Sequence, residues 1–224
     1  MAKQTDSTAP PRRPLNRERV LRAAIDLADT DGIEALSMRR LARELGVEAM
    51  SLYNHVANKD EILDGIIDAI VDEIDHPADA ADWTAAMRQC AISTRDVLVR
   101  HRWASGLWMS RQGIGPARLR HGDWMLRTLR EGGLSSDLIY QAYHVLEAYL
   151  LGFMVLHQSV PAKEEDLAGM AATFIQQIRP EEYPDLVEHI REHMDPREGR
   201  SGGFELGLDL ILEGLERAGG GSPR

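Results

Sequence analysis

The stretch LGVEAMSLYNHVANKDEIL, residues 45–63, decides the fold of the N-terminal part of the chain. Leu52 and Val56 lie four residues apart, which is the spacing of a buried pair on one face of a helix. Polar side chains stand between and after them, and Gly46 precedes them at a position where a positive φ would allow a tight turn. The stretch therefore predicts a short helix that follows a glycine turn and presents polar groups outward.

A second short helix precedes that turn. Its apolar residues recur at helical spacing, and Ser37 is a suitable N-cap. Two short helices joined by a glycine turn form the helix-turn-helix pattern. The predicted helices of this part cover Arg17–Asp31, about 38–45, roughly seven residues ending near Val56, and Lys59–Ile74 with Asn58 as its cap.

The rest of the chain predicts further helices and no clear strand alternation, so we expect an all-α protein. "HPADAADW" (residues 76–83) contains Pro77 and breaks the chain between two parts. The predicted helices beyond it are Trp83–Arg102, Ile114–Glu131, Ser135–Ser159, Lys163–Arg179 and Gly203–Ala218, with a weaker one over Pro184–Met194.

The net charge of −10 is unusual for a protein that binds nucleic acid, but it is unevenly distributed. Residues 1–60 carry ten Lys/Arg and nine Asp/Glu, whereas the remainder carries 16 and 27. Any DNA contact therefore belongs to the first 60 residues. No secretory signal is visible, and the longest apolar stretch (Val145–Leu156) is too short to span a bilayer. A single cysteine, Cys90, fits a reducing compartment, so we expect a cytoplasmic protein.

Residues 15–74 closely resemble the DNA-binding region of the TetR family of bacterial transcriptional regulators. The resemblance is carried by RVLRAAIDLADTDGIEALSMRRLARELGVEAMSLYNHVANKDEILDGIID. WTAAMRQCAISTRDVLVRHR, LREGGLSSD, LLGFMVL and GFELGLDLILEGLE look like the regulatory domain of the tetracycline-repressor branch. The resemblance implies a disordered arm (residues 1–14), a three-helix helix-turn-helix DNA-binding domain (15–75) and a larger helical ligand-binding and dimerisation domain (83–218). It also implies a homodimeric repressor that a small molecule releases from a palindromic DNA operator.

Geometry and resemblance together name the residues expected to contact DNA. Helical rotation from Leu52 turns Met50, Ser51 and Asn54 away from the core, where Asn54 could pair with adenine and Met50 could touch a thymine methyl. The resemblance implies DNA contact by Ser37 and Arg39 on the preceding helix, by positions 49, 50, 51, 53 and 55, and by Lys59 at the start of the next helix. The full set is Ser37, Arg39, Ala49, Met50, Ser51, Tyr53, Asn54, His55 and Lys59.

Some of these residues have plainer alternatives. Tyr53 could instead be half-buried and pack against the helix pair. His55 could be a solvated surface histidine. For Arg40 and Arg43 we favour surface solvation or an ion pair over base contact. Ala49 and Met50 stand where the tetracycline-repressor branch has a glutamine and a proline, so the base sequence read must differ.

Two helices carry small residues on an apolar stripe and predict a four-helix dimer interface. The stripe of the last helix, residues 203–218, comprises Phe204, Leu208, Ile211 and Leu215 beside Gly207 and Gly214; that of residues 135–159 comprises Val145, Ala148, Tyr149, Gly152 and Val155. The alternative is that both stripes serve only the core of one chain.

The effector is predicted to be small and largely apolar or aromatic. The magnesium-ligating histidine of the tetracycline-repressor branch is replaced by Trp108, so we expect neither a metal nor a cofactor. The candidate ligand-binding residues are Cys90, Thr94, Trp108, Met125, Tyr140, His144 and Glu147. Core packing is the alternative for the apolar members, and a core or interface histidine is the alternative for His144.

Three other functions were weighed. A DNA-binding regulator without a small-molecule inducer fits the same sequence. An enzyme would need Cys90, His144 and Glu147 to act together, but no recognisable catalytic pattern or Gly-rich phosphate loop accompanies them, so we expect no enzyme. Activation of transcription in place of repression also fits the sequence.

Overall fold

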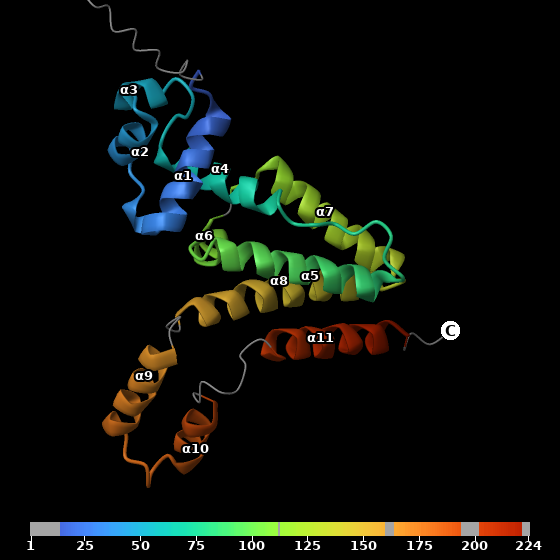
Figure 1. Cartoon of the computed structure of the whole chain (residues 1–224). Coiled ribbons are helices and arrows are strands. Elements are labelled where there is room, and N and C mark those ends of the chain that lie inside the picture. Colours follow the sequence, from blue (N-terminus) through green and yellow to red (C-terminus); the bar gives the residue numbers. More distant parts are fainter. Residues whose placement is uncertain (1–13, 112, 160–163, 194–201, 221–224) are drawn as a thin grey trace, which may run out of the picture. The chain divides into compact units, whose positions relative to one another are not determined.

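The computed structural model describes residues 14–111, 113–159, 164–193 and 202–220, and all regular structure in those ranges is helical (Figure 1). The all-α prediction is confirmed. The chain divides into two compact units, unit 1 ending at Ile66 and unit 2 beginning at Ile67. The division falls inside one helix, α4 (Lys59–Val71). The predicted arm lies outside the described residues except for Pro14.

Unit 1 follows the predicted helix pattern closely. Its elements are α1 (Arg17–Asp31), the 3-10 helix η1 (Ile33–Ala35), α2 (Met38–Leu45), α3 (Ala49–Leu52) and the first part of α4. The Asn16 side chain caps α1 by accepting a hydrogen bond from the backbone N–H of Arg19 (2.8 Å). The predicted pair Leu52 and Val56 is buried, and both residues join the core that α1, α2 and α4 supply.

Unit 2 contains the longer helices. They are α5 (Trp83–Arg100), α6 (Ala104–Ser110), α7 (Pro116–Glu131), α8 (Ser136–Ser159), α9 (Glu164–Gln177), α10 (Pro184–His193) and α11 (Gly202–Gly220). The predicted helix Trp83–Arg102 ends at Arg100, because His101 leaves the helical conformation (φ −111°, ψ 69°). After this bend the chain forms α6, which was not predicted and which buries Trp108.

Four helices of unit 2 share one hydrophobic core, α5, α7, α8 and α11. Its buried members are Met87, Ala91, Met125, Leu129, Leu134, Ile139, Ala142, Leu146, Leu150, Phe204, Leu208, Leu212 and Leu215. Three residues of the predicted α11 interface stripe therefore belong to the core of the chain itself, and that part of the prediction is wrong. The outer side of α11 instead exposes Leu206 and Leu210.

Residues 136–158 of α8 are long and apolar enough to cross a membrane by length and composition. A core helix of a soluble protein passes the same test, and α8 supplies Leu146 and Leu150 to the core of unit 2. Only a third of this segment is buried, however, and Tyr140, Val145 and Leu156 are exposed on it. One side of α8 thus serves the core and another side remains uncovered in the single chain.

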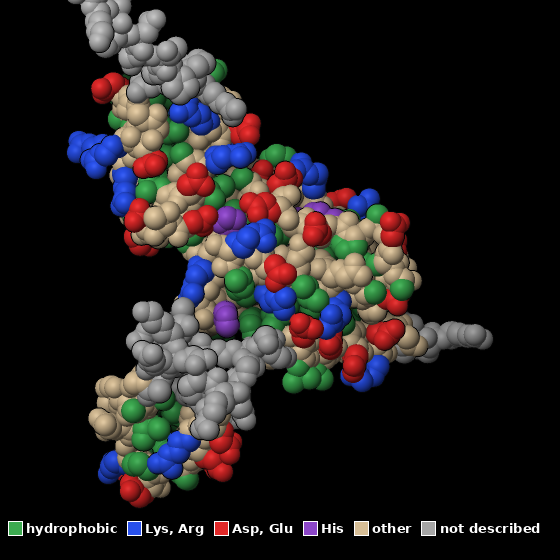
Figure 2. Space-filling model, viewed as in Figure 1, with side chains coloured by type: hydrophobic (Ala, Val, Ile, Leu, Met, Phe, Trp, Pro, Cys, Tyr) green, Lys and Arg blue, Asp and Glu red, His purple; other side chains and the backbone are tan. Residues whose placement is uncertain are grey.

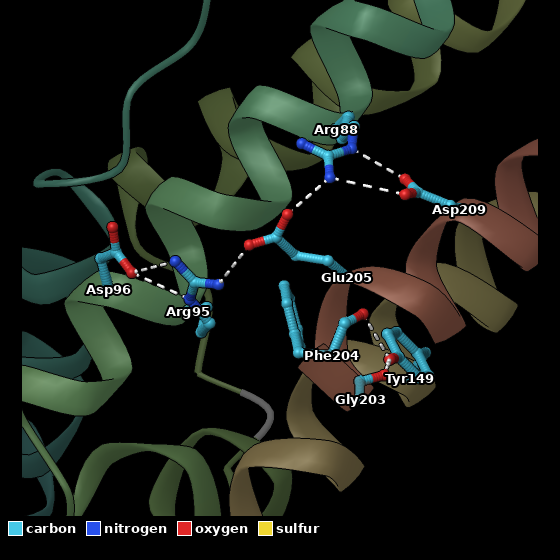
Figure 3. Close-up of polar contacts among 8 residues, drawn as sticks. All are labelled: Arg88, Arg95, Asp96, Tyr149, Gly203, Phe204, Glu205 and Asp209. Carbon is cyan, nitrogen blue, oxygen red and sulfur yellow. Dashed lines mark hydrogen bonds and ion pairs between the residues drawn. The ribbon is translucent and has the colours of Figure 1, made fainter. Parts of the chain in front are cut away.

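A network of ion pairs joins α5 to α11 (Figure 3). Arg88 bridges Glu205 and Asp209, with N–O distances of 2.7 Å to each carboxylate, and Arg95 approaches Glu205 at 3.4 Å. Hydrogen bonds from Arg88, and then from Arg95, lower the pKa of Glu205. Because these side chains are partly exposed, each pair contributes little free energy, but together they fix the register of the two helices.

Candidate nucleic-acid interface and effector cavity

The turn between α2 and α3 is built as the sequence predicts. The Ser37 side chain caps α2 by accepting a hydrogen bond from the N–H of Arg40 (3.3 Å). Gly46 ends α2 in the left-handed conformation (φ 65°, ψ 37°), and the N–H of Val47 returns to the carbonyl of Ala42 (3.0 Å). This closed turn sets the direction in which α3 leaves α2.

The regular part of α3 is shorter than predicted. It covers Ala49–Leu52, and the chain then turns through residues 53–55 before Val56. The N–H groups of His55 and Val56 both bond to the carbonyl of Leu52, at 2.9 and 3.0 Å. The predicted continuous helix to Val56 is therefore wrong, since Asn54 and its neighbours take a turn that their side chains favour.

The residues predicted to contact DNA gather around this turn and are accessible. Met50 is 74% exposed. The exposed members are Ser37, Arg39, Met50, Tyr53, Asn54 and Lys59, whereas Ala49, Ser51 and His55 are half-buried. Arg40, in contrast, forms an ion pair with Asp31, which confirms the alternative that we favoured for this arginine. On the visible face of unit 1, Lys and Arg side chains project beside α2 (Figure 2).

The start of α4 is held in place around Lys59. The Asn58 side chain accepts a hydrogen bond from the N–H of Glu61 (2.8 Å), which confirms the predicted cap. Glu61 accepts from the N–H of Ala57 (2.6 Å) and pairs with Arg17 (3.3 Å). The bond from Ala57 lowers the pKa of Glu61 more than the pairing with Arg17 does. Lys59 is thus exposed on a fixed first turn.

Four of the predicted effector residues meet at one closed cavity in unit 2. Thr94 of α5, Trp108 of α6, Met125 of α7 and Glu147 of α8 line it together with His121, Leu150 and Leu151. Its free volume is only about 10 Å³, so a ligand would have to displace side chains to enter. The ring of His121 meets Trp108 edge-on at 6.0 Å between centroids.

His121 was not among the predicted residues, because a single histidine on an amphipathic helix gives no distinctive signal. Burial lowers the pKa of His121 to about 4, which keeps its imidazole neutral at physiological pH. The cavity thus combines an aromatic wall with a neutral imidazole and the carboxylate of Glu147.

The other three predicted effector residues do not line this cavity, and their contact with an effector stays a prediction. Cys90 is only 2% exposed, and its pKa rises to about 12 because burial disfavours the thiolate. Tyr140 is 63% exposed and meets the exposed His144 edge-on at 4.6 Å. Both lie on the uncovered side of α8, because helical rotation places the core contacts of α8 on its other side.

A larger hollow lies between the loop after α4 and the helices α5 and α7. Its volume is about 720 Å³. Trp83 and Trp124 supply aromatic walls, and Arg127 and Glu131 supply charges. The remaining lining residues are His76, Pro77, Ala78, Ala80, Asp82, Ala86, Thr128 and Gly132.

Comparison with known proteins gives matches over nearly the whole chain. "Bacterial regulatory proteins, tetR family" matches residues 20–66, and "Tetracyclin repressor-like, C-terminal domain" matches residues 76–218. The transcriptional repressor DrrR1 of Streptomyces coeruleorubidus is 36% identical over 92% of this chain and 79% of its own length. The tetracycline repressor protein class C from Escherichia coli is 30% identical over 91% of both chains.

A solved structure shows the same architecture. ActR of Streptomyces coelicolor, in complex with actinorhodin, superposes with a TM-score of 0.77 and is 29% identical, covering 94% of this chain and all of its own. The helix-turn-helix unit and the helical second unit define a DNA-binding transcriptional regulator. The chain belongs to the TetR family, whose repressors respond to ligands, as its sequence predicted.

Proposed function

We propose that this protein is a cytoplasmic repressor in which residues 15–75 bind a palindromic operator and residues 83–218 bind an effector and dimerise. DNA binding is supported by one observation: polar and apolar side chains are exposed on α2, on α3 and on the turn after α3. The left-handed conformation of Gly46 sets the direction of α3 relative to α2. In helix-turn-helix proteins the N-terminal part of the second helix contacts base edges.

Selection from random duplex DNA with the purified full-length chain tests this proposal. We expect enrichment of a sequence with two-fold symmetry, and no enrichment would contradict it. Asn54→Ala should relax base preference at one position of each half-site, with a cost of about 1–3 kcal/mol against the preferred base. Asp123→Ala, a change at an exposed polar residue of α7 in unit 2, is the matched control and should leave the selected sequence unchanged.

We also propose that the effector enters the cavity lined by Trp108 and Met125. Their apolar surfaces suit an apolar or aromatic molecule, while Thr94 and Glu147 offer polar contacts. Release of operator DNA by candidate molecules tests the proposal. A true effector should also raise the melting temperature, because a ligand that binds only the folded state stabilises it by RT ln(1 + [L]/Kd).

The closed state of this cavity favours one competing function, a regulator without a small-molecule inducer. A free volume of about 10 Å³ is far below that of an open ligand site. Replacing Trp108 by alanine distinguishes a repressor that binds an effector in this cavity from a regulator without an inducer. If an effector binds there, its midpoint for operator release should change at least about tenfold, whereas a regulator without an inducer should show no release by any screened molecule.

Homodimerisation is proposed through the outer sides of α8 and α11. Tyr140, Val145 and Leu156 on α8, and Leu206 and Leu210 on α11, are large apolar side chains left exposed by the single chain. Contiguous exposed apolar surface typically marks a protein interface. Repression, as opposed to activation, is tested by a reporter gene placed behind the selected operator: expression should fall when the protein is present.

A further inference from the structure

Three side chains with metal-binding donor atoms meet inside unit 2. His76 follows α4, Cys90 lies on α5 and His121 lies on α7, so three separate segments contribute one residue each. One donor atom of each residue lies within 4.8 Å of those of the other two. The closest approach is between His76 Nε2 and His121 Nδ1, which are hydrogen-bonded at 2.9 Å.

The surroundings of this cluster are largely buried and partly aromatic. Cys90 and His121 are buried and His76 is half-buried. The Trp124 ring lies 5.1 Å from that of His76, and the Trp108 ring lies 6.0 Å from that of His121. Low polarity around the donor atoms strengthens their interaction with a cation.

The cluster also borders the two hollows described above. His76 lines the hollow of about 720 Å³, and His121 lines the closed cavity beside Trp108. An ion held by these residues would therefore be reachable from the larger hollow while touching the wall of the effector cavity.

The donor set suits a borderline-soft divalent ion. Two imidazole nitrogens and one thiolate are typical zinc ligands, and three protein ligands leave a fourth position for water or another molecule. With Zn–N of about 2.0–2.1 Å and Zn–S of about 2.3 Å, tetrahedral donor atoms are separated by about 3.3–3.6 Å. The present donor atoms lie within 4.8 Å of one another, so binding requires shifts of about 1 Å to reach that spacing.

We propose that His76, Cys90 and His121 form a binding site for Zn²⁺ or a chemically similar ion, open to the larger hollow at its fourth position. The proposal is independent of the DNA-binding function. It differs from the expectation that the chain binds no metal, which rested on Trp108 in place of the metal-ligating histidine and on the changed polar positions Cys90 and Thr94.

Binding requires the following proton changes. The Cys90 thiol releases its proton to solvent as the S–Zn bond forms, because the thiolate is the ligand. The hydrogen bond between His76 and His121 breaks, and the ring that donated it moves that proton to its other nitrogen through solvent. Each imidazole then offers a lone pair to the ion, and no oxidation or reduction takes place.

Cobalt titration of the metal-free full-length protein, purified without a histidine tag, tests the site. We expect one Co²⁺ per chain, the visible absorption of a tetrahedral ion and a thiolate-to-cobalt charge-transfer band, all abolished by stoichiometric Zn²⁺. Since Cys90 is the chain's single cysteine, any such band reports on this residue. Mg²⁺, which prefers oxygen ligands, should not compete. Failure to bind one equivalent of Co²⁺ would overturn the proposal.

Two variants keep the test independent of folding. Cys90→Ser should abolish the charge-transfer band, and a band that persists would also contradict the proposal. His76→Gln replaces the least buried ligand, so it should fold normally and weaken zinc binding at least about tenfold. His189→Gln, at an exposed histidine of α10 outside the cluster, is the matched control and should bind zinc as the parent does. Equal affinity of His76→Gln and the parent would count against His76 as a ligand.

Discussion

Lys59 shows how a single residue could contribute affinity without sequence preference. Its side chain is exposed at the first helical position of α4, and the neighbouring Asn58 and Glu61 hold that turn by hydrogen bonds. A lysine at a helix N-terminus combines its own charge with the positive end of the helix dipole, which suits a phosphate.

Lys59→Ala should weaken operator binding about equally for all DNA sequences. Each phosphate contact releases counterions, so the slope of log K against log salt should become shallower by about 1. Fluorescence anisotropy at several salt concentrations measures the slope. Arg130→Ala, at an exposed arginine of α7 in unit 2, serves as the control and should leave the slope unchanged. An unaltered slope for Lys59→Ala would argue against a phosphate contact.

Glu205 gives a prediction about pH. Its pKa is lowered from the ordinary 4.5, chiefly by the hydrogen bond from Arg88, so its stabilising contribution is present above pH 4.5. That contribution is lost as the pH falls through the lower pKa of the folded state. Glu205→Gln should therefore melt below the parent at neutral pH, and the two melting temperatures should converge in acid.

Thermal unfolding followed by circular dichroism measures this difference. Glu213→Gln removes an exposed ion pair to Arg217 (3.8 Å) and is the control, with little change expected at any pH. A difference between Glu205→Gln and the parent that stays constant below pH 4.5 would show that the Arg88 network does not set the ionisation of Glu205.

At the scale of elements, the turn after α2 depends on the backbone freedom of Gly46. A Cβ at this position would meet nothing within 4 Å, so a substitution is costly only because of the positive φ. Gly46→Ala should destabilise unit 1 by about 1 kcal/mol, and Gly46→Asn by less, since Asn tolerates this conformation better.

Urea unfolding measures how much each substitution at Gly46 lowers the free energy of unfolding. Gly106→Ala is the matched control: its Cβ is equally unobstructed, but its φ is ordinary and it lies in helix α6. It should be neutral or slightly stabilising, because alanine is the better helix former. Equal destabilisation by both changes would contradict the role assigned to the Gly46 turn.

The sequence predicted the elements that carry strong local signals. The bounds of α1 agree with the prediction, since an Asn cap begins the helix and Gly32 follows its end. The short helix α6 was missed, because it contains Gly106 and two serines and lacks a side-chain N-cap. The predicted end of α3 was too late. Leu52 and Val56 have helical spacing, but the same spacing also fits a short helix that ends at Leu52 and continues as a turn.

The candidate site was predictable only where local geometry decides it. Around α3, spacing from Leu52 was enough to tell exposed from buried positions. In unit 2 the lining of a cavity depends on how four helices pack, which spacing along one helix does not define. Spacing therefore gave no reason to name His121, and it could not show that Tyr140 and His144 lie outside this cavity.

At the scale of the whole molecule, assembly should depend on the outer side of α11. Leu210 is 58% exposed there, so Leu210→Glu would place a charge in the proposed interface without disturbing the core. We expect sedimentation to show about twice the chain mass for the parent, and a single chain of 25.0 kDa for the variant. Operator affinity should fall as well, because two half-sites are no longer bound together.

Ile114→Glu is the control for assembly. Ile114 is 79% exposed, but it lies in the loop before α7 and belongs to neither α8 nor α11. This variant should sediment as the parent does. A parent that sediments as a single chain at micromolar concentration, or a Leu210→Glu variant that keeps the mass of the parent, would exclude the proposed interface.

The burial of the chain's one thiol has a practical consequence for spectroscopy. Thiol-directed dyes react with accessible thiolates, and Cys90 is enclosed with a pKa of about 12. A cysteine introduced at the exposed Glu34 or Ile114 would therefore be labelled selectively in the otherwise natural chain. A pair of fluorophores attached in this way would follow operator release and subunit exchange in real time, with no need to remove the native cysteine first.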